Sequence, residues 1–147
     1  MSQLILPEQI VHATTVSVEG RGLIIFGPSG SGKSALALQL IALGATLVAD
    51  DRTILTKVST GLLANCPTSI QGLIEARGMG LLELPFEKDI PIHLAVDLEQ
   101  EESERLPQVH TAVFLKQPVA CFHKCDGPHF AAALILYLRH MQRIDND

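Results

Sequence analysis

Long hydrophobic runs, basic clusters and cysteines are all scarce in this 147-residue sequence. No apolar stretch approaches the roughly 20 residues of a membrane span, and the N-terminus lacks the basic region and apolar run of a signal peptide, so we expect neither. Lysine and arginine total 11 against 16 acidic residues. The net charge of −5, without a Lys/Arg cluster, argues against nucleic acid as the main partner. The odd set of Cys66, Cys121 and Cys125 forms no close framework, which favours a reducing, cytoplasmic setting.

The composition is that of a globular protein. Hydrophobic residues make up 47% of the chain and charged residues 18%, which argues against disorder. The length suits one hydrophobic core, so we expect a single domain over residues 1–147.

Apolar and β-branched runs predict many strands and few helices. The expected strands are residues 9–18, 23–26, 46–50, 53–59, 90–98, 109–116 and an edge strand over 118–123. Helices are expected over 33–43, with Gly44 at its end, and from Pro128 to about Arg143. Residues 67–86 are punctuated by glycine, and their structure is left open. The order predicts an α/β fold, a mixed sheet around one parallel βαβ core with a C-terminal helix.

A phosphate-binding loop is the strongest local signal. Gly27, Gly32, Lys33 and Ser34 satisfy G-x-x-x-x-G-K-[ST], between a predicted strand and a predicted helix. Backbone N–H groups and the helix N-terminus favour phosphate oxygens, the lysine adds positive charge, and the serine hydroxyl can ligate Mg²⁺. The alternative is a Gly-Ser-rich turn. The predicted nucleotide-binding residues are Gly27, Pro28, Ser29, Gly30, Ser31, Gly32, Lys33 and Ser34.

Two adjacent carboxylates, Asp50 and Asp51, follow the next predicted strand. Ligands of open α/β sheets bind at the carboxyl ends of strands, so both acids are expected near the phosphates. Neighbouring side chains project to different sides, so one can serve Mg²⁺ while the other faces the attacking group. A kinase needs such a carboxylate for an acceptor hydroxyl, and an ATPase could use it to position water. The alternative is an aspartate that caps a turn.

The run "GPSGSGKSALALQLIALGATLVADD", followed by "LIEARGMGLLEL", resembles the HPr kinase/phosphorylase family. The resemblance implies a P-loop kinase fold similar to phosphoenolpyruvate carboxykinase. It also implies Mg²⁺- and ATP-dependent phosphorylation of a serine in HPr, a phosphocarrier protein, and reversal of that reaction by phosphorolysis. Long members form hexamers, so a homo-oligomer is expected.

The resemblance also assigns site residues. His12 matches a catalytic histidine, and Asp51 matches the proton acceptor for phosphorylation. Glu75 matches an acidic metal ligand, which joins Ser34 at the metal, with Asp50 as a further candidate ligand. Arg77 lies in the family's signature segment, and Arg105 matches a further catalytic arginine more loosely. Without the resemblance, His12 would be a structural histidine, Glu75 and Arg77 an ion pair on one strand face, and Arg105 a surface charge.

Three departures from the family pattern stand out. The N-terminal domain of long members has no counterpart here, and Ala35 replaces the usual acidic residue after the loop. Where long members carry a P-V-R-P-G-R-N-like segment tied to dephosphorylation, this chain has "PVACFHKCDGPHF". Loss of two guanidinium groups predicts weak or absent phosphorolysis. The same stretch offers a candidate set of zinc ligands, namely Cys121, His123, Cys125 and His129. C-x₃-C is an uncommon spacing for zinc, and the alternative is that these cysteines are buried structural residues.

The sequence therefore predicts a cytoplasmic, Mg²⁺-dependent serine protein kinase that acts on an HPr-like phosphocarrier. A nucleotide-binding regulatory module and a small-molecule kinase remain as alternatives. A GTPase is disfavoured because no N-K-x-D motif is present.

Overall fold

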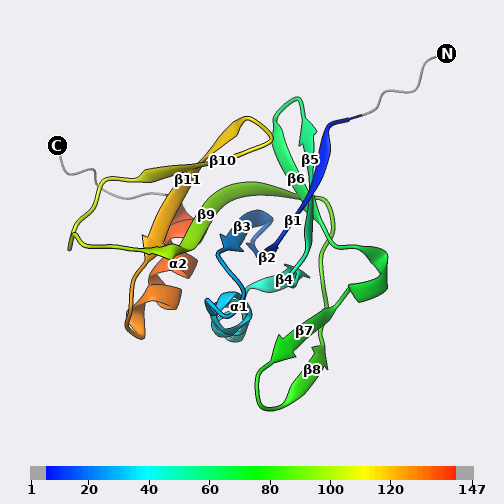
Figure 1. Cartoon of the computed structure of the whole chain (residues 1–147), viewed down its shortest axis with the longest axis horizontal. Coiled ribbons are helices and arrows are strands. Elements are labelled where there is room, and N and C mark those ends of the chain that lie inside the picture. Colours follow the sequence, from blue (N-terminus) through cyan, green and yellow to red (C-terminus); the bar gives the residue numbers. More distant parts are fainter. Residues whose placement is uncertain (1–5, 142–147) are drawn as a thin grey trace.

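The computed structural model describes residues 6–141, which form a curled mixed sheet, two α-helices and a separate hairpin (Figure 1). The helical elements are α1 Lys33–Ala42, the 3₁₀ turn η1 Thr68–Ile70 and α2 His129–His140. The strands are β1 Glu8–Val11, β2 Ala13–Val18, β3 Arg21–Phe26, β4 Thr46–Ala49, β5 Thr53–Val58, β6 Gly61–Asn65, β7 Leu73–Ala76, β8 Gly80–Glu83, β9 Ile90–Glu101, β10 His110–Phe114 and β11 Gln117–Lys124.

The expected βαβ core is present, with one strand inserted in it. β3 leads through the loop into α1 and then into β4, and β2 lies between β3 and β4, antiparallel to both. β3 and β4 therefore run in the same direction, and their carboxyl ends reach the same edge of the sheet. β9 pairs with β3 in parallel on the other side. This edge is where ligands bind in α/β folds.

The long strand β9 joins two parts of the sheet. Its first residues pair with β6, and its later residues pair in parallel with β11. The far end of the sheet is closed by β5 and β1, and β10 pairs with β11. The sheet curls because β9 changes partners along its length.

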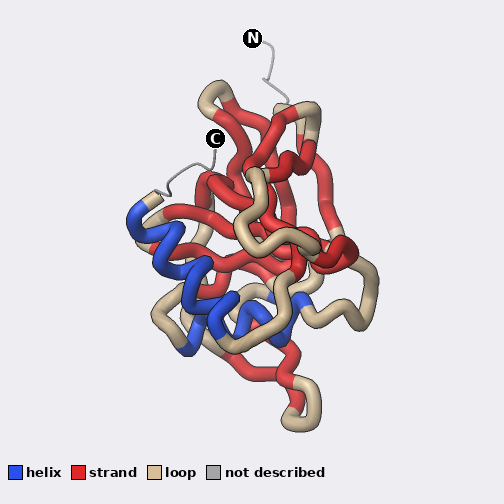
Figure 2. The backbone as a smooth tube through the Cα atoms, turned by 90° about the vertical axis from the view of Figure 1, so that its left-hand side faces the viewer, coloured by secondary structure: helices blue, strands red, loops and turns tan. Residues whose placement is uncertain are grey.

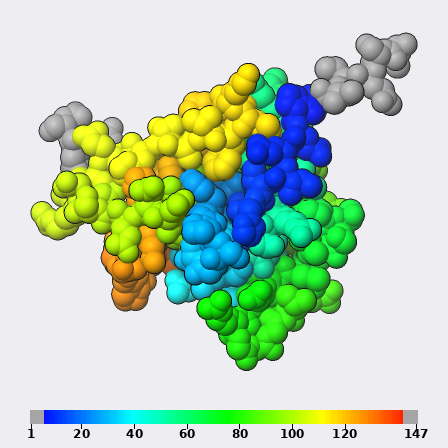
Figure 3. All heavy atoms as spheres, in the orientation of Figure 1, coloured from blue at the N-terminus to red at the C-terminus, as the bar shows by residue number. Residues whose placement is uncertain are grey.

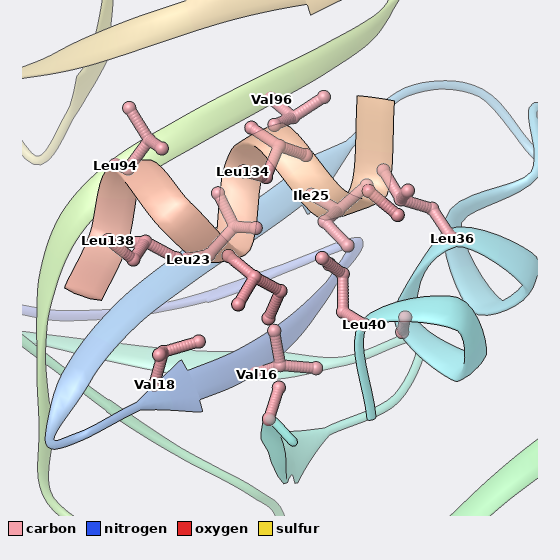
Figure 4. Close-up of a cluster of buried hydrophobic side chains, with 14 of the residues drawn as sticks. Val16, Val18, Leu23, Ile25, Leu36, Leu40, Leu94, Val96, Leu134 and Leu138 are labelled. Carbon is pink, nitrogen blue, oxygen red and sulfur yellow. The ribbon is translucent and has the colours of Figure 1, made fainter. Parts of the chain in front are cut away.

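The sheet has a hydrophobic layer on each face. Leu23 and Ile25 of β3 point to the layer that α1 and α2 cover, whereas Ile24 points to the opposite layer. Figure 4 shows the first layer, where Leu36 and Leu40 of α1 meet strand and α2 side chains. Figure 2 shows both helices together in front of the strands. Burial on both faces explains why β3 is a continuous apolar run and not an alternating one.

Several expectations about the elements were wrong or incomplete. The strand expected over 9–18 is interrupted at His12, where β1 ends and β2 begins. The stretch expected as an edge strand is β11, which is paired on both sides by β9 and β10. β6 was not expected, and residues 67–86, left open above, form η1 and the hairpin β7–β8. The C-terminal helix ends at His140 within the described residues, and Arg143 lies outside them.

Neither α-helix within residues 6–141 is long and apolar enough to cross a membrane.

Candidate active site

The predicted phosphate-binding loop connects β3 to α1 through backbone that only glycine adopts easily. Gly30 and Gly32 have φ values of 83° and 100°, which disfavour any side chain. The Lys33 ammonium donates to the carbonyl oxygens of Gly27 at 2.9 Å and Pro28 at 3.1 Å, so it lies folded over the loop. The lysine is buried, at 7% exposure, and its charge is directed into the loop.

The loop has the features of an anion site. α1 begins at Lys33 with no side-chain cap and no acidic residue in its first turn, so its N-terminal end is uncompensated. The hydroxyl oxygen of Ser31 is buried without a hydrogen-bond partner among the described residues. Unpaired donors beside a helix N-terminus fit a phosphate group.

Asp50 is buried, at 8% exposure, and accepts three hydrogen bonds. Its Oδ1 accepts from the Ser34 hydroxyl at 2.6 Å and from the Thr14 hydroxyl at 2.9 Å. Its Oδ2 accepts from the backbone N–H of Glu75 at 3.0 Å. Because Ser34 donates its proton to Asp50, the lone pairs of the Ser34 oxygen remain free for a cation.

Asp51 adopts a left-handed backbone conformation, with φ of 68°, and points away from Asp50. Its Oδ1 lies 2.6 Å from Nε2 of His12. The side chains of both residues are more than half exposed. The two adjacent acids therefore differ: the Asp50 carboxylate is buried and accepts three hydrogen bonds, whereas the Asp51 carboxylate is exposed and paired with His12.

A change of strand partners brings these residues together. The last pair of β1 with β5 joins Val11 to Thr53, and the first pair of β2 with β4 joins Thr15 to Ala49. In each of the two facing segments, three residues lie between these pairs. The segments that face each other there are residues 12–14 and 50–52. Sheet pairing on both sides thus fixes the positions of the histidine and both acids.

A cavity of about 460 Å³ lies over the loop. The hairpin β7–β8 closes one side of it, and Figure 3 shows this hairpin in green against α1 in light blue. The lining residues are Ser29, Gly30, Gly32, Lys33, Ser34, Ala35, Leu38, Asp51, Glu75, Ala76, Arg77 and Met79. Five of the eight expected loop residues therefore share one cavity with Asp51, Glu75 and Arg77, whereas Gly27, Pro28 and Ser31 are not among its lining residues.

The structure separates some residues that sequence reasoning had grouped. β7 ends at Ala76, so Arg77 lies in the turn of the hairpin and not on the strand face of Glu75. Arg105 is exposed in the segment between β9 and β10, and it is not among the residues that line the cavity. A second cavity, of about 420 Å³, lies along α2 and is lined mostly by apolar side chains, so it offers little to a nucleotide.

Two neighbours of the site were missed from sequence. Thr14 is fully buried, and its hydroxyl donates to Asp50 while it accepts from the backbone N–H of Asp51. Cys66 lies close to Asp50, and burial raises the pKa of its thiol. The only signal for Thr14 was its position two residues after His12.

Comparison with known proteins identifies related chains. Residues 3–110 match the protein family described as HPr Serine kinase C-terminal domain. The HPr kinase/phosphorylase of Bordetella pertussis is 36% identical over 119 residues, which cover 73% of this chain and 39% of that protein. The HPr kinase/phosphorylase of Clostridium acetobutylicum is 40% identical over 108 residues, which cover 67% of this chain and 35% of that protein. The chain thus spans less than half of the length of these relatives.

A solved structure shows the same fold. The Hpr(Ser) kinase/phosphatase from Coxiella burnetii matches with a TM-score of 0.75 and 24% identity, over 90% of each chain. The expected α/β architecture is confirmed, whereas similarity to phosphoenolpyruvate carboxykinase and the single-domain assignment stay predictions. Because the family match covers most of the sequence, the chain belongs to the HPr serine kinase C-terminal domain family.

Proposed function

We propose that this chain catalyses transfer of the γ-phosphoryl group of ATP to a serine of an HPr-like phosphocarrier protein. The observation that carries the proposal is the shared cavity, which holds the phosphate-binding loop and the open Asp51 carboxylate together. Similarity to proteins named HPr kinase/phosphorylase supports the choice of acceptor.

The proposed chemistry follows from the two acids. The serine oxygen forms a bond to the γ-phosphorus as its proton passes to Asp51. The bond from that phosphorus to the bridging oxygen breaks, and the electron pair leaves on ADP. Lys33 and the loop amides hold the phosphates and neutralise their charge. The His12 contact orients the Asp51 carboxylate and leaves its second oxygen for the acceptor.

The cavity also fits a hard cation. The Ser34 hydroxyl and the Glu75 carboxylate both offer oxygen atoms there, as Mg²⁺ requires. Bound Mg²⁺ would neutralise charge on the phosphate oxygens. Asp50 accepts the hydrogen bond from the Ser34 hydroxyl and does not line the cavity. We therefore propose that Asp50 orients the Ser34 oxygen towards the metal and does not bind the metal itself.

Exposed apolar side chains favour a protein as the acceptor. Met79 lines the cavity and is 80% exposed, and Leu81 on β8 is 68% exposed. Neighbouring exposed apolar residues at a cavity suit contact with a protein surface better than contact with a small polar metabolite. The cytoplasmic setting and homo-oligomeric assembly remain predictions.

The direct test incubates the protein with radiolabelled Mg·ATP and HPr, with a serine-to-alanine HPr and a mixture of small hydroxyl metabolites as parallel acceptors. We expect label on HPr alone, and none on the alanine variant. Nucleotide binding without transfer to any acceptor would refute the kinase proposal and favour a regulatory module. Label on a metabolite would favour a small-molecule kinase.

The reverse reaction is proposed to be weak. Phosphorolysis must hold phosphoserine beside inorganic phosphate, and the segment from Pro118 to Phe130 carries Lys124 and histidines but no arginine. Protonation of a histidine adds positive charge, so any residual activity should rise in mild acid. Release of phosphate from phosphoserine-HPr at neutral pH, as fast as the forward reaction, would contradict this.

A further inference from the structure

A second cluster of ligand-type side chains lies outside the cavity of the phosphate-binding loop. Glu102, His110 and His123 each offer one ligand atom, and these atoms all lie within 4.8 Å of one another. Glu102 directly follows β9, His110 begins β10 and His123 lies on β11. None of the three lines the cavity described above.

Backbone pairing holds this cluster in place. His110 pairs across the sheet with Cys121, two residues before His123, so both histidines lie on the same face. Their rings stack, with centroids 3.6 Å apart and planes within 1°. The backbone N–H of Glu102 donates to the carbonyl oxygen of Lys124 at 2.9 Å, which ties the glutamate to the end of β11.

The carboxylate is ready to act as a ligand. Its Oε1 lies 2.8 Å from Nε2 of His110, and its Oε2 accepts from the backbone N–H of Glu104. The Glu102 side chain is only 11% exposed. A shielded carboxylate beside two imidazoles is a donor set that suits a divalent cation.

We propose that Glu102, His110 and His123 bind a first-row transition metal ion of the Zn²⁺ type. Two imidazole nitrogens and one carboxylate oxygen suit Zn²⁺ or its neighbours, whereas Mg²⁺ and Ca²⁺ favour all-oxygen sites. The site is therefore chemically distinct from the proposed Mg²⁺ position. A bound ion would link β10, β11 and the start of the segment that leaves β9.

Binding requires a small local rearrangement. Ligand bonds of about 2.1 Å in a tetrahedral site place ligand atoms about 3.4 Å apart. The Glu102 and His110 ligand atoms, which lie 2.8 Å apart, must therefore separate slightly, and any pair nearer the 4.8 Å limit must close. Stacked rings also direct their lone pairs side by side, so the two imidazoles must tilt to converge on one ion. Both histidines are partly exposed, which allows the tilt and lets solvent supply a fourth ligand.

The zinc set suggested by the sequence is not assembled. Cys121 is 2% exposed, and its pKa is raised to about 11, chiefly by burial, so its thiol stays protonated at neutral pH. The Sγ of Cys125 lies 3.7 Å from Nε2 of His129, and neither residue belongs to the cluster. His123 is the one member of that expected set that joins the proposed site.

The test uses the whole chain without a polyhistidine tag, stripped with chelator and titrated with Zn²⁺ in calorimetry, with or without excess Mg²⁺. We expect one tightly bound Zn²⁺ per chain that Mg²⁺ does not displace. Glu102→Gln and His123→Ala should each weaken binding by at least about 100-fold, since even loss of a residue that only supports a ligand lowers metal affinity by 10- to 100-fold. His93→Ala and Cys125→Ser are matched controls and should bind as the wild type does. Circular dichroism of each variant checks folding.

Three results would overturn the proposal: no stoichiometric Zn²⁺ binding by the wild type, unchanged affinity in both ligand variants, or loss of binding in Cys125→Ser. Co²⁺ provides an independent readout, because thiolate ligation gives a charge-transfer band that the His/Glu site must lack. These measurements do not depend on kinase activity, so the metal site and the proposed function can fail separately.

Discussion

The substitution Asp51→Asn separates a role in catalysis from a role in folding. Asparagine keeps the shape of the side chain and tolerates the left-handed conformation that Asp51 adopts. It cannot accept the serine proton. The His12–Asp51 pair is more than half exposed, and exposed ion pairs contribute about 0–1 kcal/mol to stability. At roughly 4 °C per kcal/mol for a chain of this size, the melting temperature should fall by about 4 °C or less.

The rate of transfer should respond far more strongly. General-base catalysis contributes about 10²- to 10⁴-fold, which corresponds to about 2.7–5.4 kcal/mol of barrier. We expect single-turnover transfer from ATP to HPr to slow by that factor, while the Kd for Mg·ATP changes less than about threefold. The measurements are rapid-quench transfer of labelled phosphate and fluorescence titration of nucleotide.

Asp50→Asn is the matched comparison, because the chemical change is the same in a buried setting. Each of its three hydrogen bonds would lose a charged acceptor, worth about 1 kcal/mol per bond. We therefore expect a loss of about 2–3 kcal/mol of stability and weaker Mg²⁺ dependence. If Asp51→Asn transfers phosphate at the wild-type rate, or if the two variants exchange phenotypes, the division of roles between the acids is wrong.

Three further predictions follow from individual contacts. Lys33→Ala removes the ammonium from the loop, and Mg·ATP affinity measured by titration should fall at least tenfold; unchanged affinity would contradict the nucleotide assignment. Thr14→Val keeps the side-chain volume but leaves the N–H of Asp51 unpaired and removes a donor to Asp50, so chemical denaturation should show a loss of about 1–3 kcal/mol. The pKa of Cys121 is raised from 9.0 to about 11, so the stability that its neutral thiol contributes is present in full below pH 9 and is lost as the pH rises towards 11. Urea unfolding should show a decline in the free energy of unfolding of up to about 3 kcal/mol over this range. This decline should be absent in Cys121→Ala.

Local sequence signals predicted the parts of the site that short segments determine. The loop from Gly27 to Ser34 carries its own glycine conformations and begins its own helix, so both its position and its form could be predicted. β3 and β4 were recognised for a similar reason, as short apolar runs at the expected spacing. The adjacent acids at 50 and 51 were expected at a strand end, and that is where they lie.

Long-range pairing determined the parts that were missed. β11 is an inner strand because β9 pairs with it in parallel from 26 residues earlier in the sequence, and Pro118 gave the opposite signal. The hairpin β7–β8 is rich in glycine and lacks a clear hydrophobic period, so its place beside α1 could not be inferred. Arg105 was assigned by a loose resemblance, and no local feature placed it at or away from the cavity.

The opposite orientations of Asp50 and Asp51 follow from a change of strand partners in two neighbouring segments of the chain. Asp50 continues the direction of β4 and remains in the buried layer, where Thr14 and Ser34 are its partners. Asp51 must turn outwards because β5 begins two residues later with a new partner, β1, and its positive φ makes that turn. His12 lies at the matching break between β1 and β2. Left-handed backbone costs an aspartate about 1 kcal/mol, and the paired strands on each side offset that strain. A buried acid that holds the loop serine and an open acid that can accept a proton therefore arise from one discontinuity in the sheet, which explains why two adjacent carboxylates follow the same strand.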